Sequence, residues 1–190
     1  MAKREKTNIT LGSGKVYITE YTSDTTLSHS TICATGNLLG YIKGGATLTY
    51  SEETYEEKDD LGLVSKIITT SEKATLKLGL LTWNGETLQK LIDRCGVTSA
   101  SGTRTIKIGG AGNKQGKKWA VCFKHEDAVD GDVYVLICGR NTAGFTLTFA
   151  SEAGTVIEPE FTAMPQDDNG TLITLIEDIG AAATGGGSGT

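Results

Sequence analysis

The chain has 190 residues and a mass of 20.0 kDa, a length that can bury a sizeable core without disulfides or metals. Its 38% hydrophobic and 22% charged residues are typical of a globular protein, and no apolar run approaches the roughly 20 residues of a membrane span. With 18 basic and 23 acidic residues, the formal charge of −5 argues against a general nucleic-acid binder. The 28 Thr and 25 Gly beside only 2 Pro favour strands and tight turns.

Alternation of apolar residues with period 2 predicts strands along most of the chain. Strands with one buried face are predicted at Val16 and Ile18, at Leu48 and Tyr50, at Leu76, Leu78 and Leu80, at Trp119, Val121 and Phe123, and at Phe145, Leu147 and Phe149. Segments 133–138 and 172–176 are apolar on both faces, which predicts central strands. Turn sequences at 109–113, 130–131 and 167–170 predict hairpins.

One segment, residues 84–94, has helical periodicity instead. Asn84 is a suitable N-cap, and Glu86 complements the positive end of the helix dipole. The expected apolar stripe consists of Leu88, Leu91 and Ile92. Gly96 would end the helix in a left-handed cap. A helix of about ten residues cannot form the core of the domain, so we expect it to cover a face of the sheet.

The segment SEETYEEKDD, residues 51–60, contains six acidic residues and one lysine with little periodicity, which predicts a long solvated loop. Its acidic residues are Glu52, Glu53, Glu56, Glu57, Asp59 and Asp60. Carboxylates on one loop could hold a calcium ion, but the EF-hand spacing is absent. Tyr50 and Tyr55 supply aromatic contact area with a polar rim, which favours a protein–protein contact over a metal site.

Motifs for catalysis or cofactor binding are incomplete. The Gly-rich segment 109–118 fails as a phosphate loop, because Ala111 replaces the first glycine and Lys118 replaces the magnesium-binding Ser or Thr. It reads better as a hairpin loop. His125, Glu126 and Asp127 could supply a base and its orienting carboxylate, but no nucleophile motif accompanies them. We therefore expect no enzyme activity, catalytic residue, metal site or cofactor.

The two histidines and four cysteines lack the spacing of a metal site or of a C-x-x-C pair. The cysteines are expected to be buried free thiols. They are Cys33, Cys95, Cys122 and Cys138.

The order of these parts resembles the tail tube (major tail) proteins of long-tailed bacteriophages and of related injection particles. The resemblance covers about residues 38–178. It depends on ATLTYSEETYEEKDDLG (46–62), the predicted strand pair KIITTSEKATLKLGLL (66–81), the helix NGETLQKLID (84–93) and the series of later strands. It implies a mainly β fold, a β-sandwich or half-barrel with one flanking α-helix that closes with its neighbours into a β-barrel lumen as a ring.

The resemblance also implies a function. Homohexameric rings would stack into the hollow tail tube of the virion, a conduit for genome ejection into the host, with assembly in the bacterial cytoplasm. The partners would be further copies of the chain and other tail proteins, namely the tape measure, the tail terminator and the baseplate or tip. DNA would pass through the tube transiently and without sequence preference. This chain would not insert into a membrane. Pairing between neighbours would satisfy exposed strand edges. The implied interface residues are Tyr50, Glu52, Glu53, Tyr55, Glu56, Glu57, Asp59 and Asp60.

We expect a single domain over residues 1–179, with an extended loop at 50–61 and the helix at 84–94, followed by a flexible Gly-rich tail at 180–190. Two alternatives remain open, a β-rich capsid decoration protein and a monomeric β-sandwich binding module. A sugar-binding module would present exposed aromatic side chains, whereas Trp83 and Trp119 fit packing positions better. A hydrolase on a β scaffold would need the nucleophile and base pair that the sequence lacks.

Overall fold

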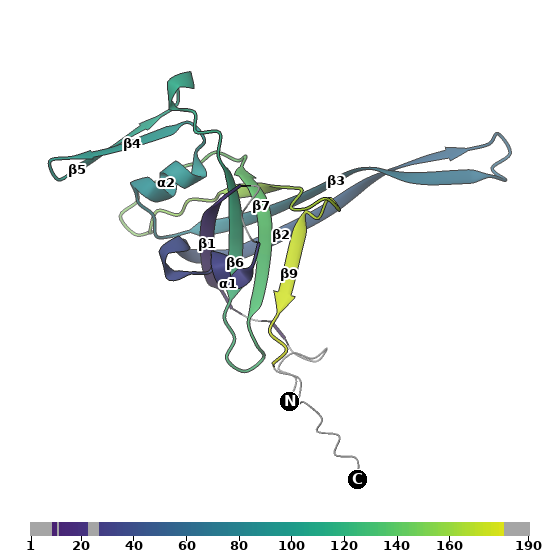
Figure 1. Cartoon of the computed structure of the whole chain (residues 1–190), viewed down its shortest axis with the longest axis horizontal. Coiled ribbons are helices and arrows are strands. Elements are labelled where there is room, and N and C mark those ends of the chain that lie inside the picture. Colours follow the sequence, from purple (N-terminus) through teal and green to yellow (C-terminus); the bar gives the residue numbers. More distant parts are fainter. Residues whose placement is uncertain (1–8, 11, 23–26, 181–190) are drawn as a thin grey trace, which may run out of the picture.

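The computed structural model describes residues 9–10, 12–22 and 27–180 (Figure 1). The expected tail beyond residue 180, and residues 1–8 of the expected domain, lie outside the described residues. No helix in the described ranges is long and apolar enough to cross a membrane.

The fold is mainly β. Its strands are β1 (Gly14–Tyr21), β2 (Leu38–Lys58), β3 (Ser65–Leu80), β4 (Cys95–Ala100), β5 (Thr103–Ile108), β6 (Lys118–His125), β7 (Val133–Asn141), β8 (Glu160–Met164) and β9 (Ile173–Glu177). The helices of the described residues are α1 (His29–Ile32) and α2 (Gly85–Leu91), with short 3-10 turns at Thr35–Asn37 and Ala111–Asn113.

Six antiparallel strands form a ring of pairings within the single chain. β1 pairs with β2, β2 with β3, β3 with β8, β8 with β7, β7 with β6, and β6 again with β1. β9 adds to β7 beside β8, and β4 and β5 form a separate two-stranded sheet. The chain thus pairs the parts of these six strands that lie in the body, whereas the outer parts of β2 and β3 pair only with each other.

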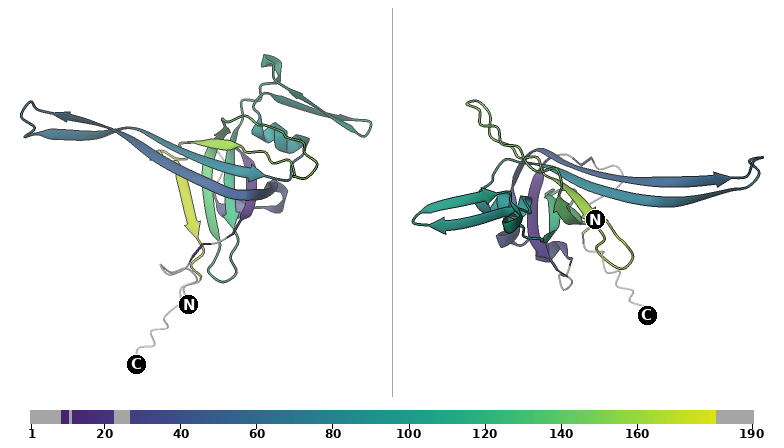
Figure 2. Two further views of the ribbon diagram at one scale, coloured as in Figure 1. Left: turned by 180° about the vertical axis from the view of Figure 1, so that it is seen from behind. Right: turned by 90° about the horizontal axis from the view of Figure 1, so that it is seen from above.

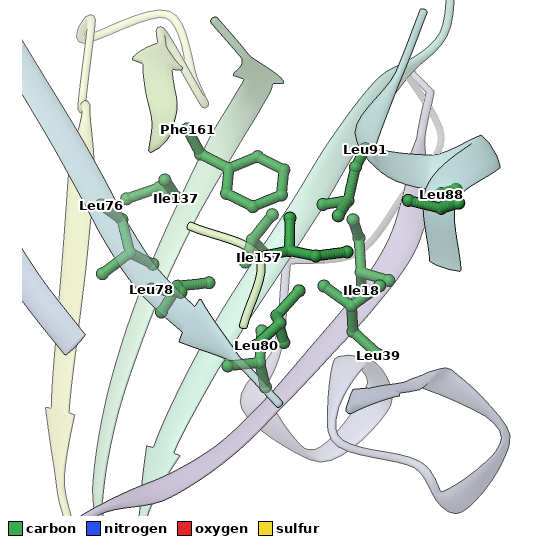
Figure 3. Packing of buried hydrophobic residues seen from close by; sticks show 12 residues of the cluster. Ile18, Leu39, Leu76, Leu78, Leu80, Leu88, Leu91, Ile137, Ile157 and Phe161 are labelled. Atoms are coloured by element: carbon green, nitrogen blue, oxygen red, sulfur yellow. The ribbon is translucent and has the colours of Figure 1, made fainter. Parts of the chain in front are cut away.

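The main core fills the inside of this ring (Figure 3). Alternate residues of β1 and β3 point inward, as their apolar periodicity predicts. They meet Ile157 and Phe161, both fully buried, and the stripe of α2. The buried cluster consists of Val16, Ile18, Leu39, Leu76, Leu78, Leu80, Leu88, Leu91, Val121, Ile137, Ile157 and Phe161. Trp83 and Trp119 pack against it, which confirms their predicted packing positions.

Helix α2 begins as predicted. The side chain of Asn84 accepts hydrogen bonds from the backbone N–H groups of Glu86 and Thr87, both at 2.9 Å. The predicted end is wrong: the helix ends at Leu91, and Gly96 lies inside β4, because the chain turns directly into the β4–β5 hairpin. The short helix α1 was not expected, so a single helix is not the whole helical content of the described residues.

Two strand predictions are wrong because the segments lack the expected partners. Residues 145–149 alternate correctly but belong to no strand, although Phe145 and Leu147 still pack against the core. Residues 172–176 were predicted as a central strand, but β9 pairs only with β7 and exposes Leu175. By contrast, β7 is central as predicted, with β6 on one side and β8 and β9 on the other.

The predicted hairpins are confirmed in part. The turn at 130–131 joins the paired strands β6 and β7. The 109–118 segment is not a hairpin loop, because β5 pairs with β4 and the segment leads to a different sheet. The turn at 167–170 is present, but it joins two strands that pair with β7 and not with each other.

All four cysteines are free thiols, as predicted. Cys95, Cys122 and Cys138 are buried, whereas Cys33 is half-buried with its Sγ 3.1 Å from that of Cys122.

Candidate subunit interface

The predicted loop at 51–60 is instead part of a long β-hairpin. Residues 50–74, here called the arm, are the outer part of β2 and β3, and their strand pairs run from Tyr50 and Ala74 to Lys58 and Ser65. The predicted strand pair at 66–81 is likewise one continuous strand, β3. At about 3.3 Å per residue, the arm carries its tip on the order of 30 Å beyond the body. Figure 2 shows it projecting alone, with no other element beside its outer half.

The arm adopts strand conformation because its β2 part and its β3 part pair with each other, although the β2 part is acidic. Residues 67–70 (IITT) are all β-branched and favour extended backbone. Thr70 is an extra residue between the pairs Glu53–Ser71 and Thr54–Thr69, and its hydroxyl donates to the Glu53 carbonyl at 3.0 Å. Such a bulge increases the local twist of a hairpin.

The turn at the tip is fixed by its own residues. The Asp59 Oδ1 atom accepts the backbone N–H of Val64 at 2.7 Å, which lowers the pKa of that carboxyl. The Gly62 N–H donates to the Asp59 carbonyl at 2.9 Å, and Gly62 has φ of +66°, a conformation that suits glycine. The tip therefore presents a defined shape.

The two tyrosines, Tyr50 and Tyr55, lie on opposite faces of the arm, because they are five positions apart on one strand. The Tyr50 hydroxyl lies 2.6 Å from Oε1 of Glu72 and 2.7 Å from Oε1 of Glu52, and this hydrogen bonding raises the pKa of Tyr50. The Tyr55 hydroxyl donates to Glu57, which likewise raises the pKa of Tyr55. Both rings are about half exposed, at 47% and 52%. These acidic residues hold the aromatic rings in place.

The tip also exposes apolar side chains that the sequence analysis missed. Leu61 and Leu63 are each 79% exposed. The full set on the arm is Tyr50, Tyr55, Leu61, Leu63, Val64, Ile67 and Ile68, half of the fourteen large exposed hydrophobics among the described residues. The available signal was the set of five large apolar residues in LGLVSKII, residues 61–68, directly after the acidic segment. Exposed apolar residues on one projecting element make it a candidate interaction surface.

The acidic residues of the arm do not gather into a cation site. Strand alternation places Glu52 and Glu56 on one face and Glu53 and Glu57 on the other. Within the described ranges, no three His, Cys, Asp or Glu side chains are grouped so that they could hold a metal ion. The structure therefore brings the predicted interface residues onto one projecting element but distributes them over two faces.

The possible catalytic group at 125–127 is divided among separate contacts. His125 is buried, and its Nδ1 lies 2.9 Å from the backbone carbonyl of Ser13. Glu126 forms ion pairs with Lys15 at 2.8 Å and Lys124 at 3.2 Å. Asp127 accepts backbone N–H groups in the turn that follows. Each side chain of this group thus has a structural contact of its own.

The chain matches no protein-family model and no curated protein. The choice of the arm as the candidate subunit interface therefore depends on its residues and its geometry.

Proposed function

We propose that this chain is a structural virion protein whose copies form stacked hexameric rings, the tail tube of a bacteriophage. The observation that carries this proposal is the arm, a two-stranded projection with an exposed apolar tip. The sequence resemblance supplies the ring and the tube, and the arm supplies a means for one subunit to hold the next.

An isolated two-stranded hairpin is at best marginally stable in water, so an arm of this length gains stability from a partner. Its outer edges also carry unpaired backbone groups: β2 pairs with β1 only at residues 38–41, and β3 pairs with β8 only at 75–77. Such edges are templates for pairing with another chain. A neighbouring copy that covers the arm would bury the apolar tip and satisfy these edges together.

The conduit role agrees with the charge of the chain. Subunits with a formal charge of −5 form a tube whose net charge repels phosphates, so DNA can pass without being retained. In this proposal the tube is assembled in the bacterial cytoplasm and contacts the tape measure, tail terminator and baseplate or tip proteins at its ends.

The test is electron microscopy and sedimentation of the purified full chain beside an arm-shortened variant. Because Ser51 pairs with Lys73, residues 52–72 can be replaced by Asn-Gly, a two-residue turn that suits a hairpin. The replacement removes the paired segments of β2 and β3 together, so no remaining strand residue loses its partner.

The full chain is expected to form hollow filaments or six-fold rings, and the shortened chain to remain a folded monomer. A shortened chain that still forms tubes would show that the arm is not the interface. Trimers of the full chain would favour a capsid decoration protein, and a persistent monomer would favour a binding module; either result would overturn the tube.

A further inference from the structure

Charge is separated along this molecule. The arm carries seven acidic residues and three lysines. Residues 94–118, which contain the β4–β5 hairpin and the segment after it, carry six basic residues and no acidic one. Figures 1 and 2 show the arm and the β4–β5 hairpin projecting from opposite ends of the body. One end of the molecule is therefore acidic and the other basic.

Three of the basic residues share one face. Lys107 lies opposite Gly96 in the hairpin, Arg94 lies two positions before Gly96 and directly before β4, and Lys114 bridges to Arg94. Paired residues and residues two apart lie on the same side of a sheet. We call Arg94, Lys107 and Lys114 the basic face.

The basic face is available for a partner. All three of its side chains are exposed, and none forms an ion pair with a described residue. The other face of the hairpin lies toward α2, where Ile106 packs against the core and Arg104 pairs with Glu86 at 2.7 Å. The hairpin is thus anchored by one face and presents the other.

We propose that the basic face receives the acidic arm of a second copy of this chain. The inference rests on the proposed function and adds to it the surface that the arm contacts. Charge complementarity identifies the occupant, since the arm is acidic and has no contact of its own to the opposite end of its chain. A contact between two different surfaces runs head to tail, and such contacts generate rings or helical stacks. Opposite charges also speed encounter and fix the register of a contact.

The experiment uses charge reversal on each side of the proposed contact. The hairpin variant carries Lys107→Glu and Lys114→Glu, and the arm variant carries Glu56→Lys and Asp60→Lys. All four positions are exposed, and none of the four side chains forms a hydrogen bond with Tyr50 or Tyr55. Both variants are therefore expected to fold. Circular dichroism melts check this, and pelleting across a concentration series gives the critical concentration for assembly.

Each variant alone is expected to raise the critical concentration at least tenfold, because the charges at the contact no longer attract. The arm variant leaves the arm with five acidic residues and five lysines, and the hairpin variant leaves the basic face with two acidic residues and one arginine. An equimolar mixture of the two variants is expected to recover assembly. The acidic arm of the hairpin variant can then contact the basic hairpin of the arm variant, and the lysines added to the arm variant can contact the glutamates added to the hairpin variant. A single chain with all four changes is expected to recover it as well.

The outcomes separate this inference from the proposed function. Variants that assemble like the wild type, or impaired variants that neither mixing nor combination rescues, would overturn the charge contact while the tube stands. A wild-type chain that does not assemble overturns both. A hairpin variant that assembles normally but loses binding of a short DNA duplex, measured by fluorescence anisotropy, would assign the basic face to nucleic acid and overturn the contact between copies.

Discussion

Removal of the apolar tip of the arm should weaken assembly without weakening the fold. Full burial of a leucine is worth about 2 kcal/mol. Leu61 and Leu63 are each 79% exposed in the single chain, so a neighbour that covers them gains about 1.5 kcal/mol from each. The double variant Leu61→Ser, Leu63→Ser should lose about 3 kcal/mol per contact, which raises the critical concentration about a hundredfold. Pelleting assays over a concentration series measure this.

The matched control is Val129→Ser, in the turn between β6 and β7. Val129 is 81% exposed, but it stands apart from the arm. We expect it to leave the critical concentration unchanged. Chemical denaturation should give all variants the same free energy of unfolding to within about 0.5 kcal/mol, because the side chains are exposed in the single chain. A tip variant that assembles within threefold of the wild type, or a control equally impaired, would refute the reasoning.

Other predictions concern the fold. Phe161→Ala should lower the free energy of unfolding by about 3–5 kcal/mol, because Phe161 is fully buried in the core; urea denaturation measures this, and a loss below about 1 kcal/mol would contradict the packing. Asn84→Ala should cost about 1 kcal/mol in the same assay by removing the N-cap, whereas Asn84→Asp should cost little. Burial opposes ionisation of Asp132, but the hydrogen bond and positive charge of Lys124, 3.0 Å away, together with hydrogen bonds from the Asp127 backbone and Tyr134, outweigh burial and lower the pKa of the carboxyl. Since the folded-state pKa lies below the unfolded value, the stabilisation is present at neutral pH and is lost as the pH falls below about 4. Thermal melts over that range should show a smaller pH dependence for Lys124→Met than for the wild type, and an unchanged dependence would exclude this pair as the cause.

The strands of the body could be predicted because their signal is local. In β3 the alternation of Leu76, Leu78 and Leu80 predicts which face of the strand meets the core. The start of α2 can likewise be predicted from Asn84, a residue type that favours the N-cap. The closed ring could not be predicted in this way. It depends on which strands pair across long stretches of sequence, as when β1 joins β6, and periodicity carries no information on partners.

The arm shows the opposite case. Its acidic half has no apolar alternation because neither face meets a core, so the periodicity rule that identifies half-buried strands has nothing to detect. Its strand conformation comes from pairing with residues 65–72. The prediction of a contact element there came from Tyr50 and Tyr55, while the exposed leucines of the tip became visible only once the hairpin was seen to project.

Under the proposed function, closure of six strands within one chain lets the subunit fold before it polymerises. The parts of these six strands that lie in the body pair within the chain, whereas the outer parts of β2 and β3, which form the arm, pair only with each other. A cell could therefore stockpile finished subunits, and the moment of growth would be set by whatever first captures an arm.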